Sequence, residues 1–155
     1  MTRSIARLAV LASFVSLLPS TVLASLGGTV STVETDRVRM NSALVGIELK
    51  GSYTVQSIQS PTGITIRQYY TANGRVFGVA WEGPWQPDLR QLFGDYFDRY
   101  RQGVQRARTT RAARGRVAID DGAFVVKIGG HLHAIAGIAY VPQLLPVGVD
   151  AAVVR

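Results

Sequence analysis

Apolar and polar residues alternate with a period of two through the middle of the chain, which predicts β-strands. Residues 52–57 and 64–69 alternate in this way on either side of the turn Ser60-Pro61-Thr62-Gly63. Asn73-Gly74 follows and indicates a hairpin, because both central residues of a type I′ turn need positive φ. A third strand, antiparallel to the second, is therefore expected from Val76 to Trp81.

The period changes to that of a helix after the tryptophan-containing stretch VFGVAWEGPWQPDLRQLFGDYF. Gly83-Pro84 breaks the strand, Pro87 suits the first helical position, and the Asp88 charge favours a helix amino terminus. Gly94 lies off the apolar face and costs ~1 kcal/mol in helix propensity, without interrupting the predicted helix. That face consists of Leu89, Leu92, Phe93, Tyr96, Phe97, Tyr100 and Val104.

Strand signals return after a stretch without sustained periodicity, residues 103–115, which is predicted to be a frayed helix end and a mobile loop. The later predictions are strands at 116–119, 124–128 and 132–141, a turn at Asp120-Asp121-Gly122, a break at Gly129-Gly130, and an edge strand from Val147 to Val154. Strands, one helix and further strands predict an α+β fold. We expect a curved antiparallel sheet of about five to seven strands packed on one long amphipathic helix.

The first 24 residues have the pattern of a secretory signal peptide. Arg3 and Arg7 precede an apolar run from Leu8 to Leu18, and Val22-Leu23-Ala24 supplies a small-residue cleavage site. The run is too short to cross a membrane, which needs roughly 20 helical residues. We expect export to the periplasm or beyond after cleavage following Ala24, with an uncleaved anchor as the alternative. Residues 25–155 would then form one α+β domain without a membrane span.

Residues 31–34, Ser-Thr-Val-Glu, fit a capping box, so a short helix to about Met40 is expected, with an extended segment as the alternative.

Charge adds a candidate interaction surface. The chain carries 17 basic and 10 acidic residues, a net charge of +7. Seven arginines fall between Arg99 and Arg116 with no acid among them, so residues near 103–116 are predicted to form a flexible basic segment. The chain has no cysteine, so its stability must come from an ordinary core.

Positions spread along the chain resemble an uncharacterised family of short exported bacterial proteins, domain of unknown function 2844. The resemblance implies one exported domain, no known activity and no catalytic residues. It also implies an acidic residue where this chain has Gln68. The residues that carry it are Leu26-Gly27-Gly28, Gly63, Arg67, Tyr69, Gly74 to Phe77, Val79, Trp81, Gly83-Pro84, Pro87-Asp88-Leu89, Leu92, Gly94, Tyr96, Phe97, Gly129-Gly130-His131, Gly137, Ala139, Tyr140 and Pro142.

Two side-chain pairs could support catalysis. His131 and His133 would project from one face of a strand, as a two-histidine metal pair requires, although no third ligand is evident. The simpler interpretation of this pair is a half-exposed strand face. Glu82 and Asp88 could be paired carboxylates, but Asp88 already has a structural role at a helix start.

Aromatic and arginine side chains suggest binding. Trp85, Tyr69 and Arg67 could line a ligand groove, while Trp81 is expected in the core with Val79 and Phe77. The arginine tract could bind an acidic envelope component or protein; nucleic acid is not expected for an exported chain. Its candidate residues are Arg106, Arg108, Arg111 and Arg114.

Two function classes follow from these residues. The first is a non-catalytic envelope binding or interaction module without a cofactor or catalytic residues. The alternative is a small metal-assisted periplasmic hydrolase that uses His131 and His133.

Overall fold

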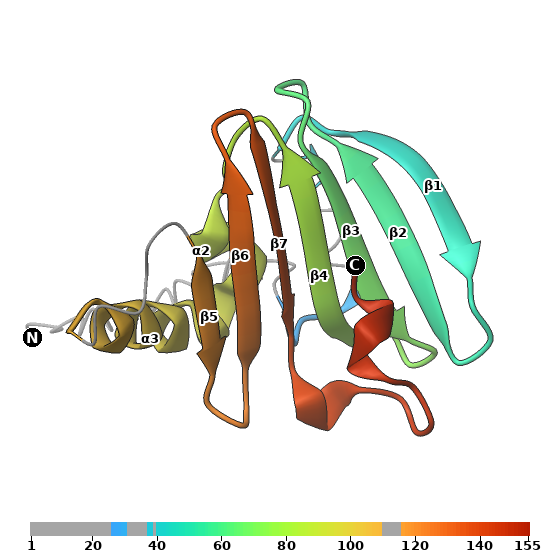
Figure 1. The fold of residues 1–155 in the computed structure, drawn as a ribbon. Coiled ribbons are helices and arrows are strands. Elements are labelled where there is room, and N and C mark those ends of the chain that lie inside the picture. The colour runs from blue at the N-terminus through green and yellow to red at the C-terminus, as the bar shows by residue number, and fades with distance from the viewer. Residues whose placement is uncertain (1–25, 31–36, 39, 110–115) are drawn as a thin grey trace, which may run out of the picture.

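An antiparallel sheet of seven strands, in the order β1-β2-β3-β4-β7-β6-β5, organises the chain (Figure 1). It is seen in a computed structural model that describes residues 26–30, 37, 38, 40–109 and 116–155. The α+β class and the predicted sheet are confirmed. The strands are β1 (Ala43–Leu49), β2 (Tyr53–Gln59), β3 (Thr65–Thr71), β4 (Val76–Gly83), β5 (Val117–Asp120), β6 (Val125–His131) and β7 (Ala134–Tyr140).

The helical segment follows β4 and covers one face of the sheet. It consists of α2 (Leu89–Phe93), a 3-10 turn η1 (Gly94–Tyr96) and α3 (Phe97–Thr109). Asp88 caps α2, since its Oδ1 accepts from the backbone N–H groups of Arg90 at 2.8 Å and Gln91 at 3.3 Å. None of the described helices is long and apolar enough to cross a membrane.

Two predictions about this helical segment were wrong. Gly94 does interrupt it, because this glycine has a φ of 48° and ends α2. The helix does not fray at Gly103 either, since α3 continues to Thr109. Gly103 instead lets α3 approach β5 closely: a Cβ there would lie 2.6 Å from the Ile119 side chain. Arg99 of α3 also pairs with Asp121 of the β5–β6 turn at 2.9 Å.

The strand predictions need three corrections. β1 was not predicted. Gly129-Gly130 does not break β6, which continues to His131, and the actual turn is Leu132-His133. Residues 147–154 form no edge strand; the tail instead contains the 3-10 turns η2 (Pro142–Leu144) and η3 (Ala151–Val153). The capping box at 31–34 lies outside the described residues.

The hairpin between β3 and β4 is confirmed, but its turn type was predicted wrongly. Gly74 has a φ of 79°, whereas Asn73 is not among the residues with positive φ. The Thr71 N–H donates to the Arg75 carbonyl, so three residues form the loop. The register then shifts between Tyr69 and Tyr70, as in a three-residue hairpin with a bulge.

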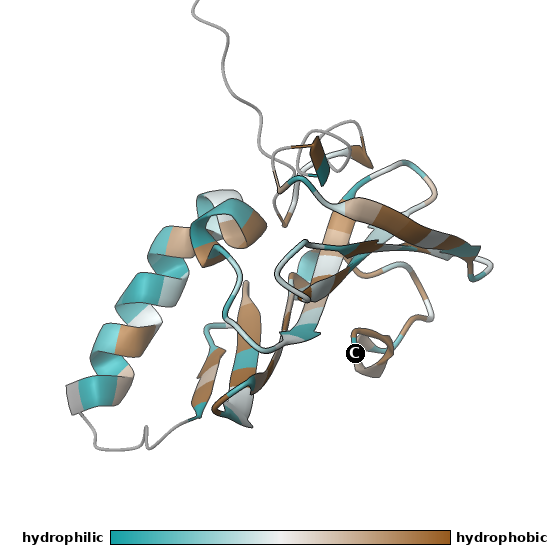
Figure 2. Cartoon of the chain, turned by 90° about the horizontal axis from the view of Figure 1, so that it is seen from above, coloured by the Kyte–Doolittle hydropathy of each residue, from teal (hydrophilic) through white to brown (hydrophobic). Residues whose placement is uncertain are grey.

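This bulge divides the apolar residues of β4 between two cores. Trp81 and Val79 lie beneath the helices, as predicted, in a core that also contains Leu92, Phe93 and Phe124. Phe77 does not join them, because the bulge turns it to the opposite face. There it packs with Tyr69, Val55 and Val154. Seen from above, the helices and the C-terminal tail lie on opposite sides of a strongly bent sheet (Figure 2).

Trp81 joins the two halves of the sheet beneath the helices. β4 and β7 pair along Gly78–Gly83 and Ile135–Tyr140, with Trp81 opposite Gly137. The indole lies across Gly137, where an added Cβ would come within 2.2 Å of its Cζ2. On its other side the indole contacts the Phe93 ring, with 5.8 Å between centroids.

Gly137→Ala should therefore destabilise the fold by about 1–3 kcal/mol, because the added methyl forces the buried indole to move. Urea unfolding measures the effect. The control is Gly129→Ala in β6, whose Cβ would lie no closer than 3.8 Å to Arg116. Equal stability of the two variants would contradict the proposed packing constraint.

A polar side chain is also trapped in the core. Gln68 is 0% exposed, and neither its Oε1 nor its Nε2 has a hydrogen-bond partner among the described residues. A buried amide without hydrogen bonds destabilises the fold, because it has lost its contacts with water. Replacing the Gln68 amide with a thioether of similar length removes this desolvation cost. Gln68→Met should thus raise the free energy of unfolding by about 1–3 kcal/mol.

Gln56→Met provides the matched control in the same unfolding experiment. Gln56 lies opposite Gln68 in β2 but remains 5% exposed, so its replacement should have the smaller effect. A loss of stability in Gln68→Met would mean that the amide makes an interaction that its surroundings do not reveal.

Candidate ligand-binding groove

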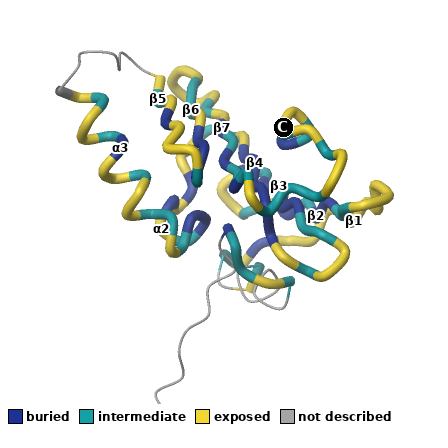
Figure 3. Tube along the Cα trace, turned by 90° about the horizontal axis from the view of Figure 1, so that it is seen from below, coloured by how far each residue is buried: buried dark blue, intermediate teal, exposed yellow. Residues whose placement is uncertain are grey.

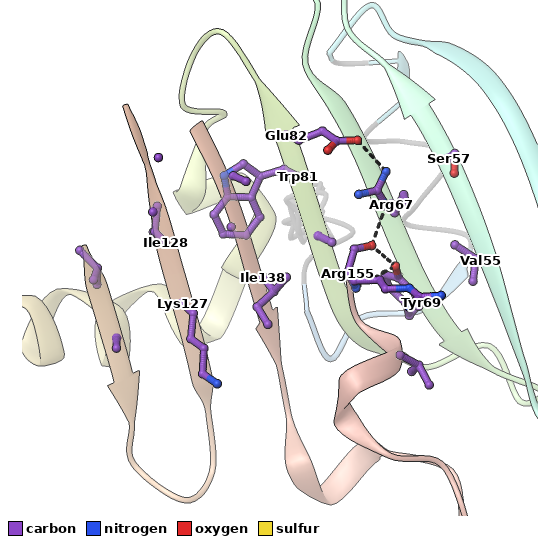
Figure 4. A pocket seen from close by; sticks show the side chains of 18 of the residues that line it. Val55, Ser57, Arg67, Tyr69, Trp81, Glu82, Lys127, Ile128, Ile138 and Arg155 are labelled. Atoms are coloured by element: carbon purple, nitrogen blue, oxygen red, sulfur yellow. Dashed lines mark hydrogen bonds and ion pairs between the residues drawn. The ribbon is translucent and has the colours of Figure 1, made fainter. Parts of the chain in front are cut away.

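A groove of about 1020 Å³ crosses the face of the sheet opposite the helices (Figure 4). Alternation along the paired strands turns one set of side chains toward this face. Small and apolar residues from four strands form its floor: Val55, Ala80, Ala118, Ala136 and Ile138. Because small side chains fill little space above the sheet, the groove remains open over β6 and β7.

The C-terminal tail forms one wall of the groove. Val154 is buried over Gly78, where an added Cβ would lie 2.7 Å from Val154 Cγ2. The Tyr69 hydroxyl donates to the Arg155 carbonyl oxygen at 2.5 Å and accepts from the Arg155 N–H at 3.1 Å. Arg67 Nε donates to the same carbonyl at 2.7 Å. Two β3 side chains therefore hold the tail against the sheet.

Basic side chains outnumber acidic ones around the groove. Lys50, Arg67, Arg116, Lys127 and Arg155 line it, against Glu48 and Glu82. Glu82 binds Arg67 at 2.9 Å, and Glu48 binds Lys50 at 2.6 Å. Within the described part of the chain, Arg116, Lys127 and Arg155 have no ion-pair partner, so positive charge is left over at the groove.

The two ion pairs shift the pKa values of Arg67, Glu48 and Lys50. Partial burial would lower the pKa of Arg67, but its hydrogen bond and ion pair with Glu82 outweigh burial and raise it. The hydrogen bond with Lys50 lowers the pKa of Glu48, and the same bond raises the pKa of Lys50. The charged forms of Arg67, Glu48 and Lys50 are thus favoured.

Of the ligand-binding candidates proposed from the sequence, the groove brings together Arg67 and Tyr69. Trp85 is exposed, as expected, but it contacts His133 at the β6–β7 turn, with 4.9 Å between ring centroids. Arg106 and Arg108 lie exposed on α3, over the other face of the sheet. Arg111 and Arg114 lie outside the described residues.

The two histidines do not have the geometry expected of a strand pair. His131 ends β6, whereas His133 lies in the turn with a φ of 63°. The rule that alternate strand residues share a face therefore does not apply to them. Across residues 26–30, 37–38, 40–109 and 116–155, no group of three or more His, Cys, Asp and Glu side chains could hold a metal.

Glu82 and Asp88 act separately. Glu82 binds Arg67 across the β3–β4 pair, and Asp88 accepts hydrogen bonds at the start of α2. The charge beside Arg67 thus comes from the neighbouring strand, not from position 68.

Several groove residues were missed in the sequence, among them Tyr53, Lys127, Ile138 and Arg155. Each lies on a strand or tail whose partner is distant in sequence. Alternation shows that Tyr53 and Val55 share a face, as do Arg67 and Tyr69. Joining the pairs requires the register in which Val55 is opposite Tyr69, and the position of the tail has no periodic signal at all.

Comparison with protein-family models identifies the family of the chain. The model of a family described as protein of unknown function (DUF2844) matches residues 22–154, and the chain belongs to this family. This confirms the resemblance found in the sequence. Neither the curated proteins nor the solved structures include a match.

Tyr69→Phe should loosen the C-terminal wall, because it removes the hydroxyl that bonds both backbone groups of Arg155. The expected loss is about 0.5–1.5 kcal/mol in stability, together with faster exchange of the Arg155 amide hydrogen. NMR-detected exchange measures this directly. Tyr53→Phe is the control, since the Tyr53 hydroxyl has no hydrogen-bond partner among the described residues; equal exchange in both variants would contradict the anchoring role.

Proposed function

We propose that this member of the DUF2844 family is an exported, non-catalytic binding module, and that the groove binds an acidic envelope component with an apolar body. The open apolar floor beside unpaired basic side chains carries the proposal. Export is supported by the signal-peptide pattern of residues 1–24.

The groove has the properties of a ligand site. Ligand pockets commonly have volumes of about 300–1,000 Å³, with mostly apolar linings and a few placed polar groups. Here an apolar chain fits over Ala80, Ala136 and Ile138, while Lys127 and Arg116 can bind an anionic group at the side formed by β5 and β6. Arg67 is less available, because its Nε already donates to the Arg155 carbonyl and its Nη1 to Glu82.

Figure 4 shows how these roles divide across the groove. Lys127 and Ile138 project from β6 and β7 on one side, and Arg67, Tyr69 and Arg155 cluster on the other. The second cluster holds the tail in place, so the first is the part of the groove able to meet a ligand. If the anionic group of a ligand binds Lys127, the apolar part of the same ligand lies over β7 and β4.

The basic surface of α3 is the competing site. Arg106 and Arg108 lie on an exposed helix, and the hollow that Arg108 borders has a volume of about 630 Å³, which is smaller than that of the groove. A purely electrostatic surface of this kind binds anions whether or not they carry an apolar chain. The two sites therefore differ in what they require of a ligand.

An NMR titration with two ligands distinguishes the groove from the α3 surface. The ligands are decanoate, which is anionic, and decanol, an uncharged molecule of equal chain length. We expect saturable shifts of the Ala80, Lys127 and Ile138 amides with decanoate, and weaker binding of decanol. Lys127→Gln should weaken decanoate binding roughly three- to fivefold, an effect that salt reduces.

Arg101→Gln is the control, since this exposed α3 residue does not line the groove and pairs with Asp98 at 3.3 Å. Shifts confined to the α3 arginines would assign binding to the helix. No saturable shift with either probe would overturn the groove proposal.

A further inference from the structure

The two edges of the sheet are protected to different degrees. β5 has four residues, is flanked by Arg116 and ends in Asp120, and α3 packs against its Ile119. β1 has seven residues, and nothing in the described part of the chain pairs with it on the side away from β2. Long edge strands without charges or cover are pairing surfaces for other chains.

β1 also exposes an unusual amount of apolar surface. Of the eight large apolar side chains that are exposed among the described residues, four lie on this strand: Leu44, Val45, Ile47 and Leu49. Figure 3 shows β1 exposed along most of its length. Glu48 is its only charged residue, and it contains no proline. Apolar patches of this kind mark interaction sites.

The apolar side chains of β1 are spaced symmetrically once its bulge is counted. Leu44 pairs with Ile58 and Gly46 with Ser57, so Val45 is the extra residue. Leu44, Ile47 and Leu49 consequently share one face, with Ile47 two pairing positions from each of the others. Such a row is complementary to its own copy when the copy is reversed.

The backbone of β1 supports the same alignment. The Lys50 N–H donates to the Tyr53 carbonyl at 2.8 Å in the hairpin to β2. Alternation then directs the backbone groups of Glu48 toward β2 and those of Ile47 and Leu49 toward the free edge. Ile47 therefore presents a donor and an acceptor at the centre of the symmetric row.

We propose that β1 pairs antiparallel with β1 of a second copy of this chain, about a two-fold axis at Ile47. Ile47 then faces its counterpart and exchanges two backbone hydrogen bonds with it, and each Leu44 faces the other copy's Leu49. Each Glu48 faces Gly46 of the other copy, so the like charges do not oppose one another. The antiparallel direction matches every other pairing in the sheet. Because one strand serves both sides, the contact closes as a dimer.

Sedimentation equilibrium of the processed protein, over a range of concentrations, tests this proposal. The wild type should have twice the chain mass and dissociate on dilution. Leu49→Lys should weaken the dimer about a hundredfold, because the charge enters the interface in both copies and each costs roughly a factor of ten. Leu132→Lys is the matched control: Leu132 is 78% exposed, as is Leu49, but lies in the β6–β7 turn, and this variant should dimerise like the wild type.

Amide exchange then locates the contact in the wild type. Exchange at Ile47 and Leu49 should slow as the dimer forms, while exchange at Leu132 stays constant. A wild type that is monomeric at every concentration overturns the proposal, as does a Leu49→Lys protein that dimerises normally. The proposal is also overturned if Leu49→Lys and Leu132→Lys weaken the dimer equally, or if amide protection appears at sites other than β1, because the contact then lies elsewhere.

Discussion

The contact between Trp81 and Gly137 is the constraint on which the rest of the fold depends. The chain builds two separate antiparallel units, β1 to β4 and β5 to β7, and only the β4–β7 pairing joins them. At that joint the indole of one unit occupies the space above the glycine of the other. The same indole also contacts the Phe93 ring of α2. The helical layer therefore packs on the strand pair that joins the two units.

The opposite face of the sheet depends on a second local feature, the bulge between Tyr69 and Tyr70. By shifting the register, the bulge turns Phe77 away from the helices and gives the far face an aromatic core with Tyr69. The C-terminal tail packs on that core and covers only part of the face. Over β5, β6 and β7 the floor is formed by smaller side chains, including Ala136 of β7 and Ala118 of β5. The groove thus results from an incomplete second layer.

Local signals predicted much of the sheet, because alternation and turn residues act over a few positions. Asn73-Gly74 located the β3–β4 hairpin, and Asp88 located the start of the helical segment. The errors arose where tertiary contacts decide between conformations. Gly129-Gly130 remains in β6 because β7 pairs along it, and Gly94 ends α2 with a backbone conformation that the helical period cannot reveal.

The candidate groove was less predictable than the fold. Arg67 and Tyr69 were identified because they alternate on one predicted strand, whereas Lys127 and Arg155 join them only through register and tail packing. The arginine count drew attention to α3 instead. Charge density along a sequence identifies basic segments, but it carries no information about which basic residues border an apolar hollow.

The free edge and the groove are connected through β1. Glu48 and Lys50 line the end of the groove nearest this edge, and a two-fold axis perpendicular to the sheet keeps the same face of both copies on the same side. Pairing through β1 would therefore align two grooves on one surface, about the axis at Ile47. A ligand with two or more anionic groups could then contact both copies, and its second contact would form at the high effective concentration that tethering provides. An apolar edge strand at the end of a basic groove thus favours an extended ligand with several anionic groups, because two modest sites on one surface bind such a ligand better than one site does.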